Sequence, residues 1–284
     1  MKKSLLNHTC MLVALAAISQ LAQAEDWSDT YIGYRTGSTF AEPYITSDIG
    51  KDIINFSHVG GYAYGTNFFN IDLLMSDSKD PAGAGSSEGA QEAYVVYRNT
   101  IDLQKVSGQS FKFGPVRDAG VTLGFDWNTK NDAGYNSKKR MLVAGPTLMI
   151  DVPGFLDVGL YELWESNAPY NTFTQVATPR YSYSPHPMLS LAWGIPLGSL
   201  PLSFEGFADF ITPKGPDEFG NNTAAETNID MQVMYDIGSA VGVAPKKFKI
   251  GFEYQYWQNK FGNNASVVPG ATAHTPMVRM EYHF

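Results

Sequence analysis

Apolar and polar residues alternate along several segments of the chain. In the clearest of them, residues 248–256, every second side chain is large and apolar, and the positions between are charged, polar or glycine. The segments 121–128, 202–210 and 228–235 follow the same pattern. A period of two places successive side chains on opposite faces of a β-strand. Because no segment shows a convincing 3.6-residue period, the sequence predicts an all-β fold.

The alternation and the turn residues around it predict twelve strands. Two of the poorly alternating ones, 139–150 and 180–192, contain Pro146, Pro185 and Pro187, which only bulges or edge positions accommodate readily. The predicted strands lie near residues 29–37, 50–63, 66–76, 90–102, 117–128, 139–150, 155–166, 180–192, 202–212, 226–237, 246–257 and 275–284.

Long and tight connections also alternate between these strands. Even-numbered strands lead mostly into tight links such as 64–65 and 151–154, although the link 103–116 is longer. Short periplasmic turns and long external loops are typical of transmembrane β-barrels. We therefore predict a transmembrane antiparallel β-barrel of about 12 strands. Odd-numbered strands lead into polar loops at 77–89, 129–138, 167–179, 213–225 and 258–274.

The two faces of the predicted strands favour a barrel in lipid over a soluble sandwich, which would alternate as well. The apolar faces end in Tyr and Trp, as an interfacial belt would. The other faces mix charges with glycine, as a polar lumen would. The last predicted strand carries apolar side chains at alternate positions and ends at Phe284. These side chains are Val278, Met280, Tyr282 and Phe284. That ending resembles the signal read by the barrel-assembly machinery, which we expect to be a partner.

The first 24 residues have the pattern of a secretory signal. Lys2 and Lys3 precede the apolar run 10–18, and Ala22-Gln23-Ala24 supplies a cleavage site. We predict a signal peptide at 1–24 and an outer-membrane barrel at 25–284. The single cysteine, Cys10, would leave with the signal, which excludes disulfides from the mature chain.

The net charge of the chain is −8, from 20 basic and 28 acidic residues. Loss of Lys2 and Lys3 would leave 18 basic residues and a net charge of −10. An acidic chain without basic clusters argues against nucleic-acid binding. It fits a protein that faces the exterior, or one that passes neutral or cationic solutes.

The chain resembles the nucleoside-specific channel (Tsx-like) family of outer-membrane proteins, in particular its OmpK-type branch. The resemblance spans residues 27–284 and implies a twelve-stranded barrel that passes nucleosides, with possible use as a receptor by phage. It does not identify the solute contacts on this chain. The segments that carry it are WSDTYIGYR at 27–35, YGTNFFN at 64–70, DLLMSD at 72–77, GFDWNTKN at 124–131, KKRML at 138–142, ETNIDMQ at 226–232 and FEYQYW at 252–257.

A nucleoside site needs aromatic faces for stacking and side chains for hydrogen bonding. The inferred inward faces supply both, and we hypothesise that Phe68, Tyr94, Tyr161 and Phe207 form a ladder along the pore. The alternative is that the charged residues are ion pairs that brace a narrow barrel. The candidate lumen residues are Phe68, Asn70, Asp72, Glu92, Tyr94, Arg98, Asp126, Tyr161, Glu205, Phe207, Asp209, Asp230, Lys249, Glu253 and Arg279.

No motif supports catalysis or a cofactor. Residues 85–89 match G-x-S-x-G, but that elbow needs a strand before it and a helix after it, and here it falls in a Gly/Ser loop. The five histidines lack the spacing of a metal site. We expect no enzyme, no metal and no cofactor, and a monomer in contact with outer-membrane lipid and lipopolysaccharide. Two alternatives stay open: a phage or adhesion receptor with little transport, and a general small-solute porin.

Overall fold

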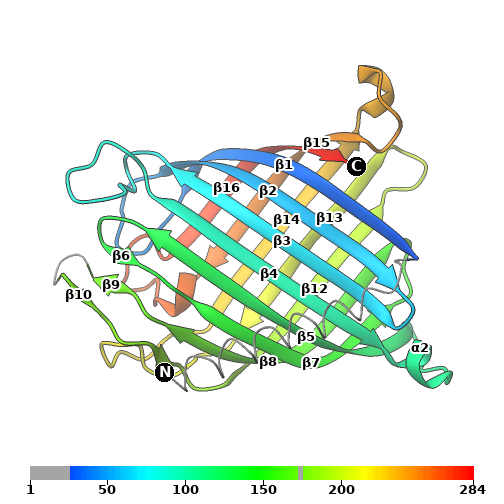
Figure 1. The fold of residues 1–284 in the computed structure, drawn as a ribbon, viewed down its shortest axis with the longest axis horizontal. Coiled ribbons are helices and arrows are strands. Elements are labelled where there is room, and N and C mark those ends of the chain that lie inside the picture. Colours follow the sequence, from blue (N-terminus) through cyan, green and yellow to red (C-terminus); the bar gives the residue numbers. More distant parts are fainter. Residues whose placement is uncertain (1–25, 172–174) are drawn as a thin grey trace, which may run out of the picture.

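The computed structural model describes residues 26–171 and 175–284, so the predicted signal peptide lies outside the described residues. Twelve long strands make up most of this part of the chain (Figure 1). They are β1 (Trp27–Phe40), β2 (Ile49–Tyr62), β3 (Gly65–Ser76), β4 (Gln91–Asp102), β5 (Val116–Asn131), β7 (Arg140–Ile150), β8 (Phe155–Asn167), β12 (His186–Pro196), β13 (Leu202–Ile211), β14 (Glu226–Asp236), β15 (Phe248–Gln258) and β16 (Thr272–His283).

These strands form one closed ring in which every neighbour is antiparallel. Strands adjacent along the chain pair with each other, and the first and last strands close the ring through a register that includes Ile32 opposite Tyr282. Closure leaves no long strand of the ring with an unpaired edge, which is the requirement for backbone polar groups in lipid. The predicted all-β, twelve-stranded antiparallel barrel is confirmed.

The two ends of the barrel differ in their connections. At one end the links are mostly short, such as the two residues between β2 and β3, although the links 103–115 and 237–247 are longer. At the other end lie long loops that hold the short strands β6 (Tyr135–Asn136), β9 (Tyr170–Asn171), β10 (Val176–Ala177) and β11 (Tyr181–Ser182), of which β6, β9 and β10 pair with one another. Figure 1 shows this loop end opposite the end that carries α2.

The long link predicted at 103–116 contains α2 (Leu103–Ser107). Asp102 caps its start by accepting a hydrogen bond from the Lys105 amide at 2.8 Å, and Gly108 ends it in the left-handed conformation. A short helix thus accounts for the length of this connection. No helix in the described ranges is long and apolar enough to cross a membrane.

The eighth predicted strand, 180–192, is present but interrupted: β11 and β12 both pair with β8, and residues 183–185 separate them. The structure begins β12 at His186 and continues it to Pro196. Pro185 and Pro187 remove two backbone donors within three residues, so a ladder cannot run through both. The chain before them keeps β8 as its partner, since Tyr181 and Ser182 pair with Asn167 and Ser166 of that strand, but the register shifts by one residue before His186 pairs with Leu163.

The G-x-S-x-G match at 85–89 lies in the loop between β3 and β4, and the next element is a strand. It therefore does not form a strand-to-helix elbow.

Within residues 26–171 and 175–284, the buried apolar side chains inside the ring form two small clusters near the loop end of the strands. One surrounds Ile49 and Ile53, and the other surrounds Val143 and Leu163.

Candidate functional site: the lumen of the barrel

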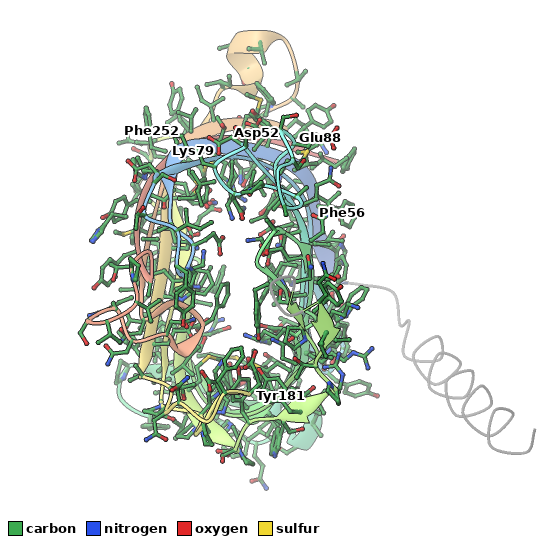
Figure 2. All side chains as sticks on the ribbon, turned by 90° about the vertical axis from the view of Figure 1, so that its left-hand side faces the viewer. Asp52, Phe56, Lys79, Glu88, Tyr181 and Phe252 are labelled. Carbon is green, nitrogen blue, oxygen red and sulfur yellow. The ribbon has the colours of Figure 1, made fainter. Side chains whose placement is uncertain are left out.

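The outward faces of the strands form a continuous apolar surface. Val233, Phe252 and Val278 lie in register on three adjacent strands and are 42%, 75% and 52% exposed. Figure 2, an end-on view from the loop end, shows Phe56 and Phe252 on the outer side of the ring. A soluble protein rarely leaves so much contiguous apolar surface in water.

Aromatic side chains border this apolar surface at both ends. Trp127 and Trp164 lie near the loop end of their strands, and Tyr235 and Tyr282 lie near the short-turn end. All four are exposed on the same face as the apolar belt. Two aromatic girdles around an apolar band, with long loops at one end, define the bacterial outer-membrane architecture. The chain is an outer-membrane β-barrel.

The period of the strands places the fifteen candidate residues on the face opposite the belt. Whether they bind a solute stays a prediction. Their positions are Phe68, Asn70 and Asp72 on β3, Glu92, Tyr94 and Arg98 on β4, Asp126 on β5, Tyr161 on β8, Glu205, Phe207 and Asp209 on β13, Asp230 on β14, Lys249 and Glu253 on β15, and Arg279 on β16.

One inner sector is a network of arginines and carboxylates. Glu253 accepts a hydrogen bond from Nη1 of Arg279 at 2.7 Å, and its other oxygen is 3.4 Å from Nε of Arg35. Arg35 in turn donates to Asp72 at 2.7 Å, and Nε of Arg279 donates to Glu281 at 2.7 Å. The network joins β15, β16, β1 and β3 across the seam where the ring closes.

A second network lies on β4 and β5. Nη1 of Arg98 donates to Asp126 at 2.5 Å, and the Tyr94 hydroxyl donates to the other oxygen of the same carboxylate at 3.0 Å. Farther toward the loops, the Asn128 amide donates to Glu92. These predicted residues are therefore in contact with one another, and the ion pair Arg98–Asp126 fits the bracing interpretation for this sector.

The sector formed by β8, β13 and β14 is acidic. Lys249 lies 3.8 Å from Glu205, whose other oxygen accepts from Gln232 at 3.1 Å. Among the described residues, no basic group lies within 4.0 Å of Asp157, Asp209, Glu226 or Asp230. The last three accept hydrogen bonds from neutral donors, and one buried oxygen of Asp157 has no hydrogen-bond partner. Carboxyl groups therefore outnumber basic groups on this wall.

The four candidate aromatic side chains differ in their environments. Phe68 is 37% exposed on the inner face, so its ring is open to solvent in the lumen. Tyr161 is buried beside Met188, and its hydroxyl lies 3.0 Å from that of Thr147. Among the described residues none of the four rings contacts another. Phe68 thus offers the most accessible stacking surface, whereas Tyr161 is part of the wall.

Charged residues at the loop end fold into the mouth of the barrel. Glu42, in the loop between β1 and β2, has one oxygen 2.5 Å from Nζ of Lys51 and 3.2 Å from Nζ of Lys260, and its other oxygen is 3.7 Å from Nζ of Lys130. Burial alone would raise the pKa of Glu42, but the three ammonium groups outweigh it and hold the pKa well below 4.5. One carboxylate thus joins three separate segments.

A second link at the mouth is built on Glu218, in the loop between β13 and β14. One carboxylate oxygen accepts a hydrogen bond from the Tyr135 hydroxyl, and the other accepts from the Tyr181 hydroxyl at 2.6 Å. The three residues come from three different loops. In Figure 2, which looks into the loop end, Tyr181 lies at the lower side of the ring. Glu218 therefore ties the loops of this side together.

Replacing Glu218 with alanine is expected to increase single-channel conductance and its fluctuations. Each hydrogen bond to a charged acceptor contributes about 2 kcal/mol, so losing both releases the loop from the wall. Planar-bilayer recording measures the effect. The Glu88→Ala variant is the control, because Glu88 makes its hydrogen bonds to Ser86 and Ala82 through its backbone. Equal recordings from the two variants would show that Glu218 does not restrain the mouth.

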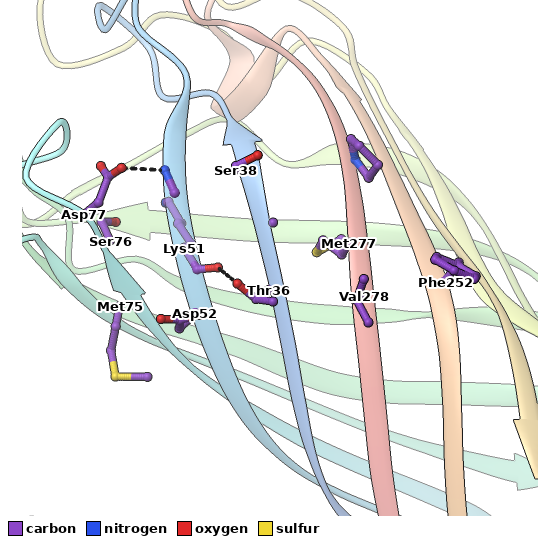
Figure 3. A pocket seen from close by; sticks show the side chains of 13 residues that line it. Thr36, Ser38, Lys51, Asp52, Met75, Ser76, Asp77, Phe252, Met277 and Val278 are labelled. Atoms are coloured by element: carbon purple, nitrogen blue, oxygen red, sulfur yellow. Dashed lines mark hydrogen bonds between the residues drawn. The ribbon is translucent and has the colours of Figure 1, made fainter. Parts of the chain in front are cut away.

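A shallow groove crosses the outer wall near the loop end of β1, β2 and β3 (Figure 3). Its lining includes Thr36, Asp52, Met75 and Val278. The Asp52 carboxylate, unusual on this face, accepts a hydrogen bond from the Tyr34 hydroxyl at 2.6 Å. Because the groove lies on the side of the apolar belt, it is not part of the lumen.

No protein-family model and no curated protein matches the sequence. Similar solved structures include the KdgM porin in complex with disordered oligogalacturonate, at 12% identity over 89% of this chain and 99% of that one, with a TM-score of 0.42. The translocator domain of the autotransporter NalP from Neisseria meningitidis is also similar, at 12% identity over 99% and 98%, with a TM-score of 0.48. Neither likeness bears on what this barrel carries.

Several residues of these networks were not among the sequence candidates. Glu165 lies on the inward face of β8 and accepts from Nζ of Lys214 at 2.9 Å. Strand alternation alone would have placed Glu165 inside. Lys214 and Glu42 are in loops, where no period indicates which way a side chain points.

Proposed function

We propose that this barrel is an outer-membrane channel for the passive diffusion of nucleosides or similar small solutes. The observation that supports it best is the contrast between the two faces of a closed twelve-stranded ring. The outer face is apolar, whereas the inner face holds charged networks and an exposed aromatic ring at Phe68. A polar inner surface suits water-soluble solutes.

The charge of the wall favours neutral and cationic solutes over anions. Asp157, Asp209 and Asp230 face the lumen with no basic group within ion-pair distance among the described residues. A low-dielectric channel lined by one sign of charge concentrates the opposite sign and repels its own. Nucleosides are uncharged, so this wall admits them while it disfavours nucleotides.

Nucleosides are proposed because two observations agree with the family resemblance. Phe68 offers a ring to a base, and Tyr94, Arg98 and Asp126 on the adjacent strands offer hydrogen-bonding groups. A base stacked on an aromatic ring is stabilised by about 1–3 kcal/mol whatever its identity. Such weak sites permit release as well as entry, which a channel requires.

Single-channel conductance in a planar bilayer, with and without adenosine or thymidine, tests this function. We expect a small conductance that nucleosides block and glucose does not. An open conductance indifferent to nucleosides would indicate a general porin. Absence of conductance would favour a receptor barrel.

The Phe68→Ala substitution is expected to weaken nucleoside block about tenfold, because it removes the exposed stacking surface. Tyr94→Ala is expected to act in the same direction. The matched control is Phe252→Ala, which removes an aromatic ring from the outer face and should leave the block constant unchanged. If nucleoside block is the same in the Phe68→Ala and control proteins, Phe68 is not a solute contact.

A further inference from the structure

Arg140 begins β7 on the outer face of the barrel, at the loop end. It lies in register between Trp127 on β5 and Ser166 on β8. Trp127 and Leu142, the next outward residue of β7, are 47% and 61% exposed on the same face. Arg140 is itself exposed. Its position in the aromatic girdle places it where lipid headgroups meet the acyl region.

Arg180, from the loop that leads into β11, is held beside it. Its Nη2 donates to the Lys138 carbonyl at 2.9 Å, and its Nη1 donates to the Ser166 hydroxyl at 3.0 Å. Ser166 is the cross-strand neighbour of Arg140. Slight burial, and then the positive charge of Arg140, lower the pKa of Arg180. Two guanidinium groups therefore share one site on the outer rim.

No acidic side chain neutralises these arginines. In residues 26–171 and 175–284, neither Arg140 nor Arg180 has a carboxylate within 4.0 Å, and Lys138 beside them is also exposed. The one outward-facing acid of β8, Glu162, lies four residues below Ser166, beyond Trp164. An unneutralised positive cluster is notable in a chain with a net charge of −8.

We propose that Arg140 and Arg180 bind the phosphate of an anionic lipid of the outer leaflet. The guanidinium group presents paired donors that match phosphate oxygens. The apolar surface of Leu142 and Trp164 directly below would receive the acyl chains. A phosphorylated lipid fits both parts of the site, whereas free phosphate would use only the arginines. The lipid A part of lipopolysaccharide has this chemistry. The site is independent of the solute carried through the lumen.

Native mass spectrometry of the membrane-purified protein with added lipid A tests the site. Lipid A carrying both phosphates is compared with its dephosphorylated form. We expect Arg140→Ala with Arg180→Ala to weaken binding of the phosphorylated form about 30-fold, since each arginine near an anionic surface contributes about fivefold. The lysine double variant keeps the charge but not the paired donors, so we expect intermediate binding.

The control is Arg117→Ala, which removes an exposed arginine at the opposite end of β5. We expect it to bind phosphorylated lipid A like the unmodified protein. The proposal is overturned if the alanine double variant binds as tightly as the control. It is also overturned if the unmodified protein holds the dephosphorylated lipid equally well. A heat-modifiability assay confirms that each variant is a folded barrel.

Discussion

Replacing Glu253 with glutamine is expected to reduce the free energy of unfolding by about 3–5 kcal/mol. The carboxylate is 3% exposed and lies between two arginines, 2.7 Å from Nη1 of Arg279 and 3.4 Å from Nε of Arg35. A neutral amide leaves both guanidinium groups with less opposing charge in a dry part of the wall. The network also spans the seam between β16 and β1, where the ring closes.

The measurement is urea unfolding in detergent micelles, followed by the mobility shift of the folded barrel. Asp209→Asn is the matched control, because Asp209 also faces the lumen but accepts a hydrogen bond from the neutral hydroxyl of Ser190, at 2.6 Å. We expect the control to lose far less stability. Equal losses in the two variants would mean that the arginine network does not stabilise the closure of the ring.

The Glu42→Gln substitution is expected to loosen the mouth of the barrel at neutral pH, with a local loss of about 3 kcal/mol. Three ammonium groups would then lie together without the carboxylate that joins them. The loops 41–48 and 259–271 should be affected together, because the Tyr44 amide also bonds the Pro269 carbonyl at 2.8 Å.

The effect of Glu42 depends on pH in a defined direction. Its pKa in the folded protein is held below 4.5, so its contribution is fully present above pH 4.5 and is lost as the pH falls through the lower, folded value. Hydrogen exchange of the two loops should therefore differ between the unmodified and Glu42→Gln proteins near neutral pH, and converge in strong acid.

The control for this experiment is Glu88→Gln, in the loop between β3 and β4, where the side chain is exposed. We expect its exchange to match that of the unmodified protein at every pH. A difference between the Glu42→Gln and unmodified proteins that persists unchanged in strong acid would contradict the assigned role of the Glu42 carboxylate.

The structure divides the lumen charges between the two interpretations that the sequence left open. Arg98–Asp126 and Arg279–Glu253 are ion pairs in the wall and fit the bracing interpretation. Asp209 and Asp230 accept hydrogen bonds from Ser190 and Gln255 and lie in no ion pair among the described residues. Sequence alone could not make this division, because each pair joins residues on different strands.

The sequence by itself determined the class of fold, the approximate positions of eleven of the twelve long strands and the face that each side chain occupies. These properties depend on local alternation, and a period of two leaves no freedom in which face a residue takes. At 180–192 it did not show that the strand is interrupted before His186 and continues to Pro196, because alternation does not locate a break at Pro185.

Only the tertiary structure decided which charges meet. Arg279 reaches Tyr31 across 248 positions of sequence, and Lys260 reaches Glu42 across 218. The same holds for the loops, where Glu218 bonds tyrosines of two other loops, and for the outer rim, where Arg180 lies beside Arg140. Such contacts depend on the closure of the ring and on loop conformations, which no periodic pattern encodes.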